Sequence, residues 1–345
     1  MRSRVTLSVL GAALVFTLSG CSESPGTTAE VAAPSGAFEY MEVLAADSME
    51  GRRTGTAGSA RAARFIEKRF AAAGLEAAGD SGFYQLIPMS LTEGRRGRMR
   101  PRLLESWAAW DTLPPDGRIK EANIVGVLPG SDPKLRDEFV LVTAHYDHVG
   151  IGRPVDGDSI YNGADDDASG TAALIWIAES LAAADTRPAR SIVFAAVTGE
   201  EMGLLGTRWY ITDPPVPLHQ TVANLNIEMI ARPDPDLGPG RSWLTGFERT
   251  TMGEMLAAAG LAIDSDPHPE QNYYERSDNI AFARLGIPAH TLSSYGGHGE
   301  YHSPNDETEL ADRDHMAAVA EVAVRAVVEL ANGEAPTWKE GFGPM

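Results

Sequence analysis

The sequence contains one cysteine, Cys21, in 345 residues. No disulfide bond can therefore form within the chain, and a hydrophobic core must supply the stability of the fold. Basic residues are also scarce, since 29 Lys and Arg face 48 Asp and Glu and the formal net charge is -19. Nucleic acid is therefore disfavoured as a partner, because binding phosphates requires a basic surface. The excess of carboxylates suits a soluble protein that handles cations or cationic groups.

The N-terminal apolar stretch, residues 5–18, is too short and wrongly flanked to span a membrane. With the basic residues before it, it predicts a signal peptide over residues 1–20. The segment Leu18-Ser19-Gly20-Cys21 at the end of this stretch resembles the lipobox of bacterial lipoproteins. The resemblance implies cleavage before Cys21 and lipidation of that cysteine. The protein is then expected on a membrane of the bacterial cell envelope, on its periplasmic or extracellular face. An ordinary signal peptide with an incidental cysteine is the alternative.

Length and composition favour one large α/β unit behind this leader. Residues 21–36 are rich in Ser, Pro, Ala and Gly and predict a flexible tether. The folded domain is expected over residues 37–335, followed by a C-terminal tail at 336–345. The hydrophobic content of 43% is enough for a substantial core.

Strands and helices are expected to alternate from residue 123 onward, which predicts a three-layer α/β/α fold around a mixed, mostly parallel sheet. Apolar runs predict strands at residues 139–143, 191–197, 222–227 and 287–292. Apolar residues at helical spacing predict helices at 62–70, 171–181 and 312–330, the first of them ending near Gly74.

Residues 81–121 have no clear periodicity and carry five arginines between Arg95 and Arg102. We expect a solvated loop or an edge hairpin here. Contact with anionic lipid headgroups is the alternative for an anchored protein.

Three consecutive carboxylates, Asp165 to Asp167, stand between Gly163 and Gly170. The residues after Gly170 predict a buried helix. A cluster of charge at the start of a buried helix requires compensation, because isolated buried charges are costly. A divalent metal ion is the simplest source of that compensation.

Polar side chains also follow the predicted strands. His145 and Asp147 follow the first strand, Glu200 and Glu201 the second, and Glu228 the third. A loop rich in glycine and polar residues contains His302. Open α/β sheets bind ligands beyond the carboxyl ends of their strands, so these groups can converge. Imidazoles and carboxylates are ligands for zinc or a similar divalent ion.

These motifs resemble the co-catalytic two-zinc exopeptidases, the family of bacterial leucyl-type aminopeptidases related to glutamate carboxypeptidase and the transferrin receptor. The similarity runs from about Phe38 to Leu330 and includes His145-Tyr146-Asp147, Gly163-Ala164-Asp165-Asp166, Glu200-Glu201 and Tyr301-His302. It implies two divalent metal ions, with zinc as the expected metal. The implied metal ligands are His145, Asp166, Glu201, Glu228 and His302.

Within this resemblance, Asp166 bridges the two ions and the bond after it is cis. Glu200 is the general base, and Asp147 orients His145. Glu228 departs from the Asp that is usual in the family, and Asn279 stands where a His is often found. We assign no ligand role to His148, His290, His298 and His315.

The expected activity is aminopeptidase action on peptides with a free N-terminus. A carboxypeptidase or an N-acyl amino acid amidohydrolase with the same metal site is a second possibility. A non-catalytic binding protein is a third, of another class. The sequence gives no indication of the oligomeric state.

Overall fold

A computed structural model describes residues 35–94 and 99–344. The predicted signal peptide, Cys21 and most of the predicted tether lie outside these residues. The first helix, α1 (Ser35–Leu44), includes the last two residues of that tether. Among the described residues, none of the helices combines the length and the apolar character needed to cross a membrane.

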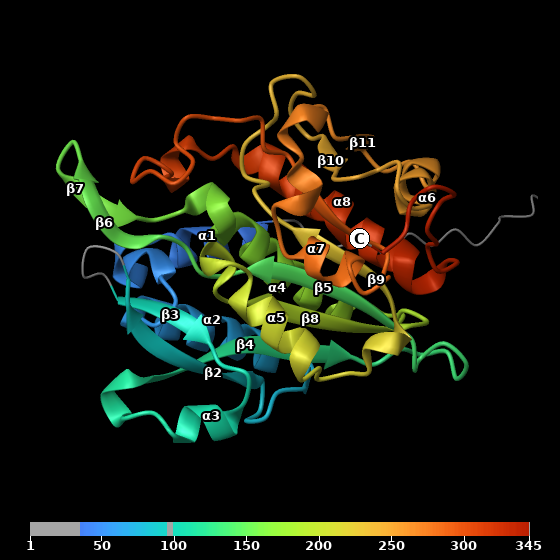
Figure 1. The fold of residues 1–345 in the computed structure, drawn as a ribbon. Helices are drawn as coiled ribbons and strands as arrows, with labels where there is room; N and C mark the ends of the chain where they lie inside the picture. Colours follow the sequence, from blue (N-terminus) through green and yellow to red (C-terminus); the bar gives the residue numbers. More distant parts are fainter. Residues whose placement is uncertain (1–34, 95–98, 345) are drawn as a thin grey trace, which may run out of the picture. The chain divides into compact units, whose positions relative to one another are not determined.

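A mixed sheet forms the centre of the fold (Figure 1). Its strand order is β11-β10-β12-β9-β5-β8-β4-β2-β3, and β1 pairs with β4. The strands are β1 (Glu76–Ala77), β2 (Tyr84–Glu93), β3 (Met99–Leu103), β4 (Arg118–Leu128), β5 (Phe139–His145), β8 (Ser191–Val197), β9 (Thr221–Ile227), β10 (Ser242–Leu244), β11 (Ile263–Ser265) and β12 (Ala289–Ser293).

Parallel pairing is concentrated in the middle of this sheet. Strands β12, β9, β5 and β8 run parallel to one another, and so do β10 and β11. The pairs of β4 with β8, β2 and β1, of β2 with β3 and of β10 with β12 are antiparallel. The sheet is mixed as predicted, but it is less parallel than predicted, because hairpin-connected strands extend it beyond β8.

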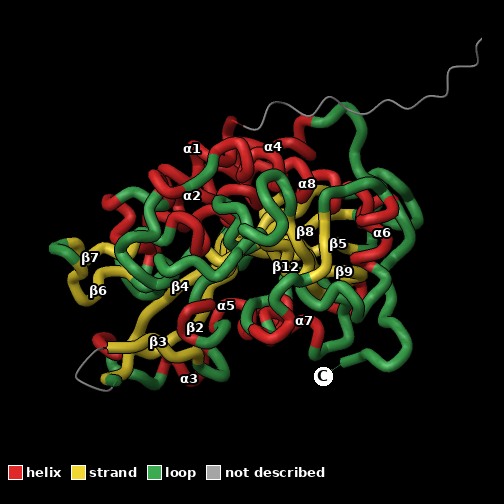
Figure 2. Tube along the Cα trace, turned by 90° about the horizontal axis from the view of Figure 1, so that it is seen from above, coloured by secondary structure: helices red, strands yellow, loops and turns green. Residues whose placement is uncertain are grey.

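Helices cover both faces of the sheet (Figure 2). Helices α1, α2 (Ala57–Ala73), α4 (Gly170–Ala183) and α8 (Arg313–Asn332) pack on one face. Helices α5 (Leu205–Thr212) and α7 (Asn279–Ala283) lie on the other. The remaining α-helices of the described residues are the short α3 (Trp107–Asp111) and α6 (Met252–Ala258). The predicted three-layer α/β/α arrangement is confirmed.

The alternation of side chains along the central strands explains why both faces of the sheet are covered. In β5, Val140 and Val142 join the core under α4, while Leu141 between them joins the core under α5 and α7. Successive side chains of a strand point to opposite faces, so a strand that is apolar throughout must be covered on both sides. Helix α4 is buried on nearly all sides for the same reason, since other helices and the sheet surround it.

Residues 81–121 form more regular structure than expected. Strands β2 and β3 make an antiparallel hairpin at the edge of the sheet, and β4 already begins at Arg118. The prediction of an edge hairpin is therefore confirmed, and the prediction of a solvated loop is wrong. The strand pattern is hard to recognise in the sequence because Pro88 and Pro101 lie inside these strands, where proline is uncommon.

The end of the chain is docked onto this domain. The amide of Thr251 donates to the carbonyl of Thr337 over 2.9 Å, and the indole of Trp338 donates to the carbonyl of Gly286 over 2.7 Å. A separate two-stranded ribbon, β6 (Gly150–Val155) and β7 (Asp158–Tyr161), extends from the segment after β5.

Candidate metal centre

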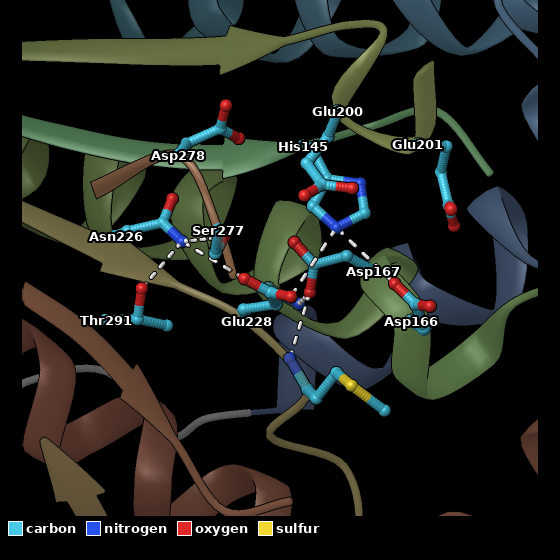
Figure 3. A network of polar contacts seen from close by, with 12 residues as sticks. His145, Asp166, Asp167, Glu200, Glu201, Asn226, Glu228, Ser277, Asp278 and Thr291 are labelled. Atoms are coloured by element: carbon cyan, nitrogen blue, oxygen red, sulfur yellow. Dashed lines mark hydrogen bonds and ion pairs between the residues drawn. The ribbon is translucent and has the colours of Figure 1, made fainter. Parts of the chain in front are cut away.

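Three neighbouring parallel strands deliver the predicted residues to one edge of the sheet. His145 is the last residue of β5, Glu200 and Glu201 follow β8 after a turn, and Glu228 follows β9 directly. The carboxyl ends of parallel strands meet at the same edge. Figure 3 shows His145 between Glu228 and Glu201, with Asp166 beside it.

Two groups of possible metal ligands share Asp166. In the first group, His145 Nε2 lies 3.4 Å from Asp166 Oδ1 and 4.0 Å from Glu228 Oε1. In the second group, His302 Nε2 lies 3.0 Å from Asp166 Oδ2 and 3.1 Å from Glu201 Oε1. The two oxygens of one carboxylate thus face two different ligand groups.

The structure adds His148 to the second group, although the sequence analysis assigns it no ligand role. His148 Nδ1 lies 2.9 Å from Glu201 Oε1 and 3.6 Å from Asp166 Oδ2. The ring is fully buried. The spacing of three residues from His145 could have suggested this histidine, but only the path of the chain after β5 decides which way its ring points.

Unsatisfied buried atoms test whether a cation fits here. Among the described residues, His145 Nε2, His148 Nδ1, Asp166 Oδ2 and Glu201 Oε1 are buried and make no geometrically acceptable hydrogen bond. Buried polar atoms in native proteins are almost always satisfied. Nitrogen and carboxylate oxygen atoms that converge without hydrogen bonds fit divalent metal ions with mixed N and O ligands.

The pKa values in the second ligand group also favour a bound cation. Burial would lower the pKa of His302, but Asp166 and Glu201 outweigh it and raise this pKa to about 10. Burial and Asp166 would raise the pKa of Glu201, but His148 and His302 outweigh them and lower it to about 2. Without a cation, protons on the imidazoles must balance these carboxylates. A metal ion can take the place of those protons.

Hydrogen bonds fix the loop that carries the three aspartates. Asp306 accepts from the amides of Asp165 and Asp166, each over 3.0 Å. Asp167 accepts from the amides of Gly170 and Met229 over 3.0 and 3.1 Å. Asp166 is therefore left to face the histidines. The peptide bond after Asp166 is cis, as the family resemblance implies.

Arg52 holds the same loop from the other side. Its fully buried guanidinium donates to the carbonyls of Leu44, Asn162 and Gly163, and its Nε donates to the carbonyl of Tyr146. It therefore joins the segment after β5 to the start of the aspartate loop. Burial lowers the pKa of Arg52, and Asp167 and Asp166 oppose that effect.

The imidazole of His145 is oriented by the backbone of Asp147. His145 Nδ1 lies 3.1 Å from the Asp147 carbonyl oxygen, and the nearer carboxylate oxygen of Asp147 is 3.8 Å away. That carboxylate instead accepts from the Glu200 amide over 3.1 Å and from the Thr54 hydroxyl over 3.0 Å. Asp147 thus links the imidazole of His145 to the turn that carries Glu200.

Glu200 is the predicted base, and its surroundings favour binding a proton. Burial raises the pKa of Glu200 well above its ordinary value, and Glu228 and Asp278 add to this effect while His145 opposes it. Glu228 itself has its pKa raised to about 7, mainly by burial. Its Oε2 accepts from the Asn226 side chain over 3.3 Å. General bases with a pKa near the working pH are the most effective.

His290, His298, His315 and Asn279 lie apart from the two ligand groups. His290 is bonded to Thr245 and Thr250, and His315 Nε2 lies 2.9 Å from the Ser294 hydroxyl. His298 Nε2 lies 2.9 Å from Asp165 Oδ2, so it supports the aspartate loop. Asn279 bonds to Tyr274 and Thr291.

A small cavity of about 40 Å³ opens beside Glu228. Beside several Ser and Thr hydroxyls, its wall includes four aromatic side chains and one arginine: Trp243, Tyr273, Tyr295, Tyr301 and Arg276. The Arg276 guanidinium lies 5.0 Å from the centre of the Tyr273 ring. The cavity, called the aromatic cavity below, thus adjoins the first ligand group and has a mixed lining of aromatic and polar side chains.

Residues 123–327 match Peptidase family M28, and the chain belongs to this family. The match covers more than half of the chain and includes every predicted metal ligand. The predicted resemblance to two-metal exopeptidases is therefore confirmed at the level of the family.

Relatives and solved structures agree with this assignment. A probable leucine aminopeptidase of Trichophyton verrucosum is 27% identical over 62% of this chain and 59% of its own length. BSAP, a zinc aminopeptidase from Bacillus subtilis, has the same fold, with a TM-score of 0.62 at 15% identity, over 88% of this chain and 96% of its own. A glutaminyl cyclase from Porphyromonas gingivalis also shares the fold, with a TM-score of 0.58 at 17% identity, over 87% and 99%. The chain spans only 35–59% of the length of the first three curated relatives it matches.

Proposed function

We propose that this protein is a metal-dependent aminopeptidase that releases N-terminal residues from peptides. The observation that carries the proposal is the position of Asp166, whose two oxygens face two separate groups of imidazole and carboxylate ligands. Such an arrangement suits a pair of divalent ions bridged by one carboxylate. The family and the activity of the named relatives support the peptidase assignment.

His145, Asp166 and Glu228 would hold one ion, and Asp166, Glu201 and His302 the other, with His148 as a further ligand of the second. Zinc is the metal we propose, since the ligands are imidazoles and carboxylates. When bound, such a pair of ions supplies a water of lowered pKa and polarises the scissile carbonyl.

Glu200 moves the protons of the reaction. It takes a proton from the attacking water and delivers it to the departing amine. Its buried position raises its pKa, which favours holding the proton between these two events. Asp147 positions both this residue, through the Glu200 amide, and His145, through its own carbonyl.

The substrate's free ammonium group is expected on the side of the first ligand group. Glu200, Glu228 and Asp278 lie close enough there for each to affect the ionisation of its neighbours. The aromatic cavity next to Glu228 would then receive the side chain of the first residue. A carboxypeptidase or an amidohydrolase would not need a free ammonium in this position.

Comparing free and N-acetylated aminoacyl amides tests the proposed activity, with metal analysis of the same sample. We expect hydrolysis of the free amides only, and two zinc ions per chain. Hydrolysis of the acetylated amides would contradict the proposal. Since a glutaminyl cyclase shares the fold, peptides with N-terminal glutamine are included, and their cyclisation without hydrolysis of other peptides would also contradict it.

We also propose that the mature protein is anchored in the bacterial cell envelope through lipid on Cys21. The tetrapeptide Leu18-Ser19-Gly20-Cys21 and the absence of any other cysteine from the sequence support this proposal. Substituting Cys21→Ser should block processing or release the protein from membranes. A Cys21→Ser protein that is processed normally and stays membrane-bound would contradict it.

A further inference from the structure

A second cavity, of about 450 Å³, lies on the other side of the candidate metal centre and is lined by Glu201. Its lining is rich in arginine, which is unexpected in a chain with a net charge of -19. The four arginines are Arg53, Arg100, Arg102 and Arg208.

Two elements that pack together supply three of these arginines. Arg100 and Arg102 stand two residues apart on β3, so their side chains leave the strand on the same face, while Pro101 between them is buried. Arg208 comes from α5, which lies beside β2 and β3 (Figure 2). The fold therefore directs the three guanidiniums into one cavity.

These three charges have no ion-pair partner in the part of the chain that the structure describes. Within residues 35–94 and 99–344, Arg100, Arg102 and Arg208 make no ion pair with a carboxylate, and their side chains donate none of the hydrogen bonds found there. Arg53 donates to the carbonyl of Val149 over 3.3 Å. The carboxylate that does line the cavity, Glu201, already faces His148 and His302. Arg100, Arg102 and Arg208 are all exposed to solvent, which screens their mutual repulsion, so their guanidiniums remain available to an anionic ligand that enters the cavity.

The two cavities differ in charge and lie on opposite sides of the proposed reaction centre. Figure 3 shows Glu228, which lines the aromatic cavity, and Glu201, which lines the arginine cavity, on opposite sides of His145. Arg100, Arg102 and Arg208 would repel the ammonium group of a substrate more strongly than Arg276, the one arginine of the aromatic cavity, which shares that cavity with Glu228. We therefore expect the amino end towards Glu228 and the part of the peptide that leaves towards the three arginines.

We propose that the arginine cavity binds a carboxylate on the leaving side of the substrate, and this inference rests on the proposed aminopeptidase function. The carboxylate belongs either to the C-terminus of a dipeptide or to an acidic side chain in the second residue. Arginine suits this ligand because its planar guanidinium can donate two parallel hydrogen bonds to a carboxylate. The enzyme is accordingly selective for short or acidic peptides.

Four substrates that share one N-terminal residue separate the two sources of the carboxylate. Leu-Gln-amide has no carboxylate, Leu-Gln has one at the C-terminus, Leu-Glu-amide has one in the side chain, and Leu-Lys-amide carries an extra positive charge. We expect kcat/KM to be about tenfold to a hundredfold higher for at least one carboxylate-bearing substrate than for Leu-Gln-amide. Leu-Lys-amide should be the poorest substrate, and added salt should reduce the differences.

Variants then connect this preference with the cavity. Arg100→Gln, Arg102→Gln and Arg208→Gln should each reduce the ratio of kcat/KM between the carboxylate-bearing substrate and Leu-Gln-amide. Arg325→Gln is the matched control, because Arg325 is an exposed arginine on α8 that does not line the cavity. It removes the same charge and should leave the ratio unchanged. An equal loss of preference in Arg325→Gln would overturn the proposal, since net charge alone would then be responsible.

A binding measurement keeps this inference separate from the proposed activity. Reduced-amide analogues of Leu-Glu-amide, Leu-Gln and Leu-Gln-amide, which cannot be hydrolysed, are titrated into the metal-loaded protein by calorimetry. Tighter binding of a carboxylate-bearing analogue that is lost in the cavity variants supports the proposal even if no peptide is hydrolysed. Equal binding of all three analogues overturns it even if the protein is an active aminopeptidase.

The same variants distinguish a peptide carboxylate from a lipid headgroup as the ligand of the arginine cavity. If the arginines instead contact anionic headgroups, the three cavity variants bind phosphatidylglycerol vesicles less well and discriminate between the peptides as the unmodified protein does. That result would overturn the proposed peptide-binding role.

Discussion

The carboxylate of Asp306 accepts a hydrogen bond of 3.0 Å from the amide of Asp166, 140 residues away in the sequence. The same carboxylate accepts from the Asp165 amide, and the Asp306 carbonyl accepts from the Ala164 amide. The loop that carries the proposed bridging ligand is therefore held by the segment that follows His302. The two halves of the second ligand group are positioned together.

Substituting Asp306→Ala should therefore lower metal occupancy without removing any ligand. Two amides lose their acceptor in a buried position, which costs about 1–3 kcal/mol for each group left unsatisfied. Metal content after dialysis and the thermal unfolding midpoint measure the two effects. Asp314→Ala is the control, because Asp314 is exposed at the start of α8. Unchanged metal retention in Asp306→Ala would show that the loop keeps its shape without this carboxylate.

Glu200 and Glu201 should respond differently to the same substitution. Glu200→Gln removes a proton acceptor but no proposed ligand, so kcat should fall by roughly two to four powers of ten while metal binding survives. Glu201→Gln should weaken a metal site and lose activity through occupancy, so added zinc should restore part of it. Metal analysis and zinc titration of both variants measure this difference. Zinc rescue of Glu200→Gln instead would mean that the two roles are exchanged.

Glu228 is expected to coordinate a metal ion despite its departure from the usual Asp. Its Oε1 lies 4.0 Å from His145 Nε2, within the first ligand group. Glu228→Ala should lower the metal content towards one ion per chain and reduce activity severely. Metal analysis together with turnover measures the outcome. Unchanged metal content and turnover would remove Glu228 from the proposed ligand set.

His148 should strengthen the second metal site. Its Nδ1 lies 2.9 Å from Glu201 Oε1, and burial prevents water from replacing it easily. Loss of a ligand or of a side chain that orients one lowers metal affinity about tenfold to a hundredfold, so His148→Ala should release one ion at lower chelator concentration. Chelator titration followed by metal analysis measures this release, and His219→Ala is the control. Identical titrations for the unmodified protein and His148→Ala would contradict the prediction.

Protonation of the buried His290 should make the fold less stable in weak acid. Burial lowers the pKa of His290 from 6.5 to about 4. Its Nδ1 donates to the carbonyl of Thr245, and its Nε2 accepts from the Thr250 hydroxyl, each over 2.7 Å. As the pH falls, the imidazole of His290 therefore becomes protonated at a higher pH in the unfolded chain than in the folded protein. The stability from neutral His290 is fully present above about pH 6.5 and is lost as the pH falls towards 4, up to about 3 kcal/mol.

Urea unfolding between these two pH values measures that loss. The difference in unfolding free energy between the unmodified protein and His290→Gln should shrink as the pH falls, because the variant has no imidazole to protonate. The comparison cancels the titration of carboxylates that both proteins share. A difference that is independent of pH would contradict the assigned cause.

The sequence alone was sufficient for the elements with a strong periodic or apolar pattern. Strands β5, β8 and β9 and helices α2, α4 and α8 lie where the patterns predict them. Strand β12 begins at Ala289, after Pro288, because proline has no amide hydrogen to donate to the ladder. Strands β10 and β11 have three residues each, too few to show a pattern.

The motifs also determined most of the proposed site, because ligand residues at the ends of neighbouring parallel strands must meet at one edge. Only the tertiary structure decided what surrounds them. Contacts between distant segments turn His148 towards Glu201, hold the Asp166 amide on Asp306 and bury Arg52. The arginine cavity is the clearest case. Arg100 and Arg102 lie about a hundred residues from Glu201 and Arg208 in the sequence, and they line one cavity with both because β3 packs beside α5.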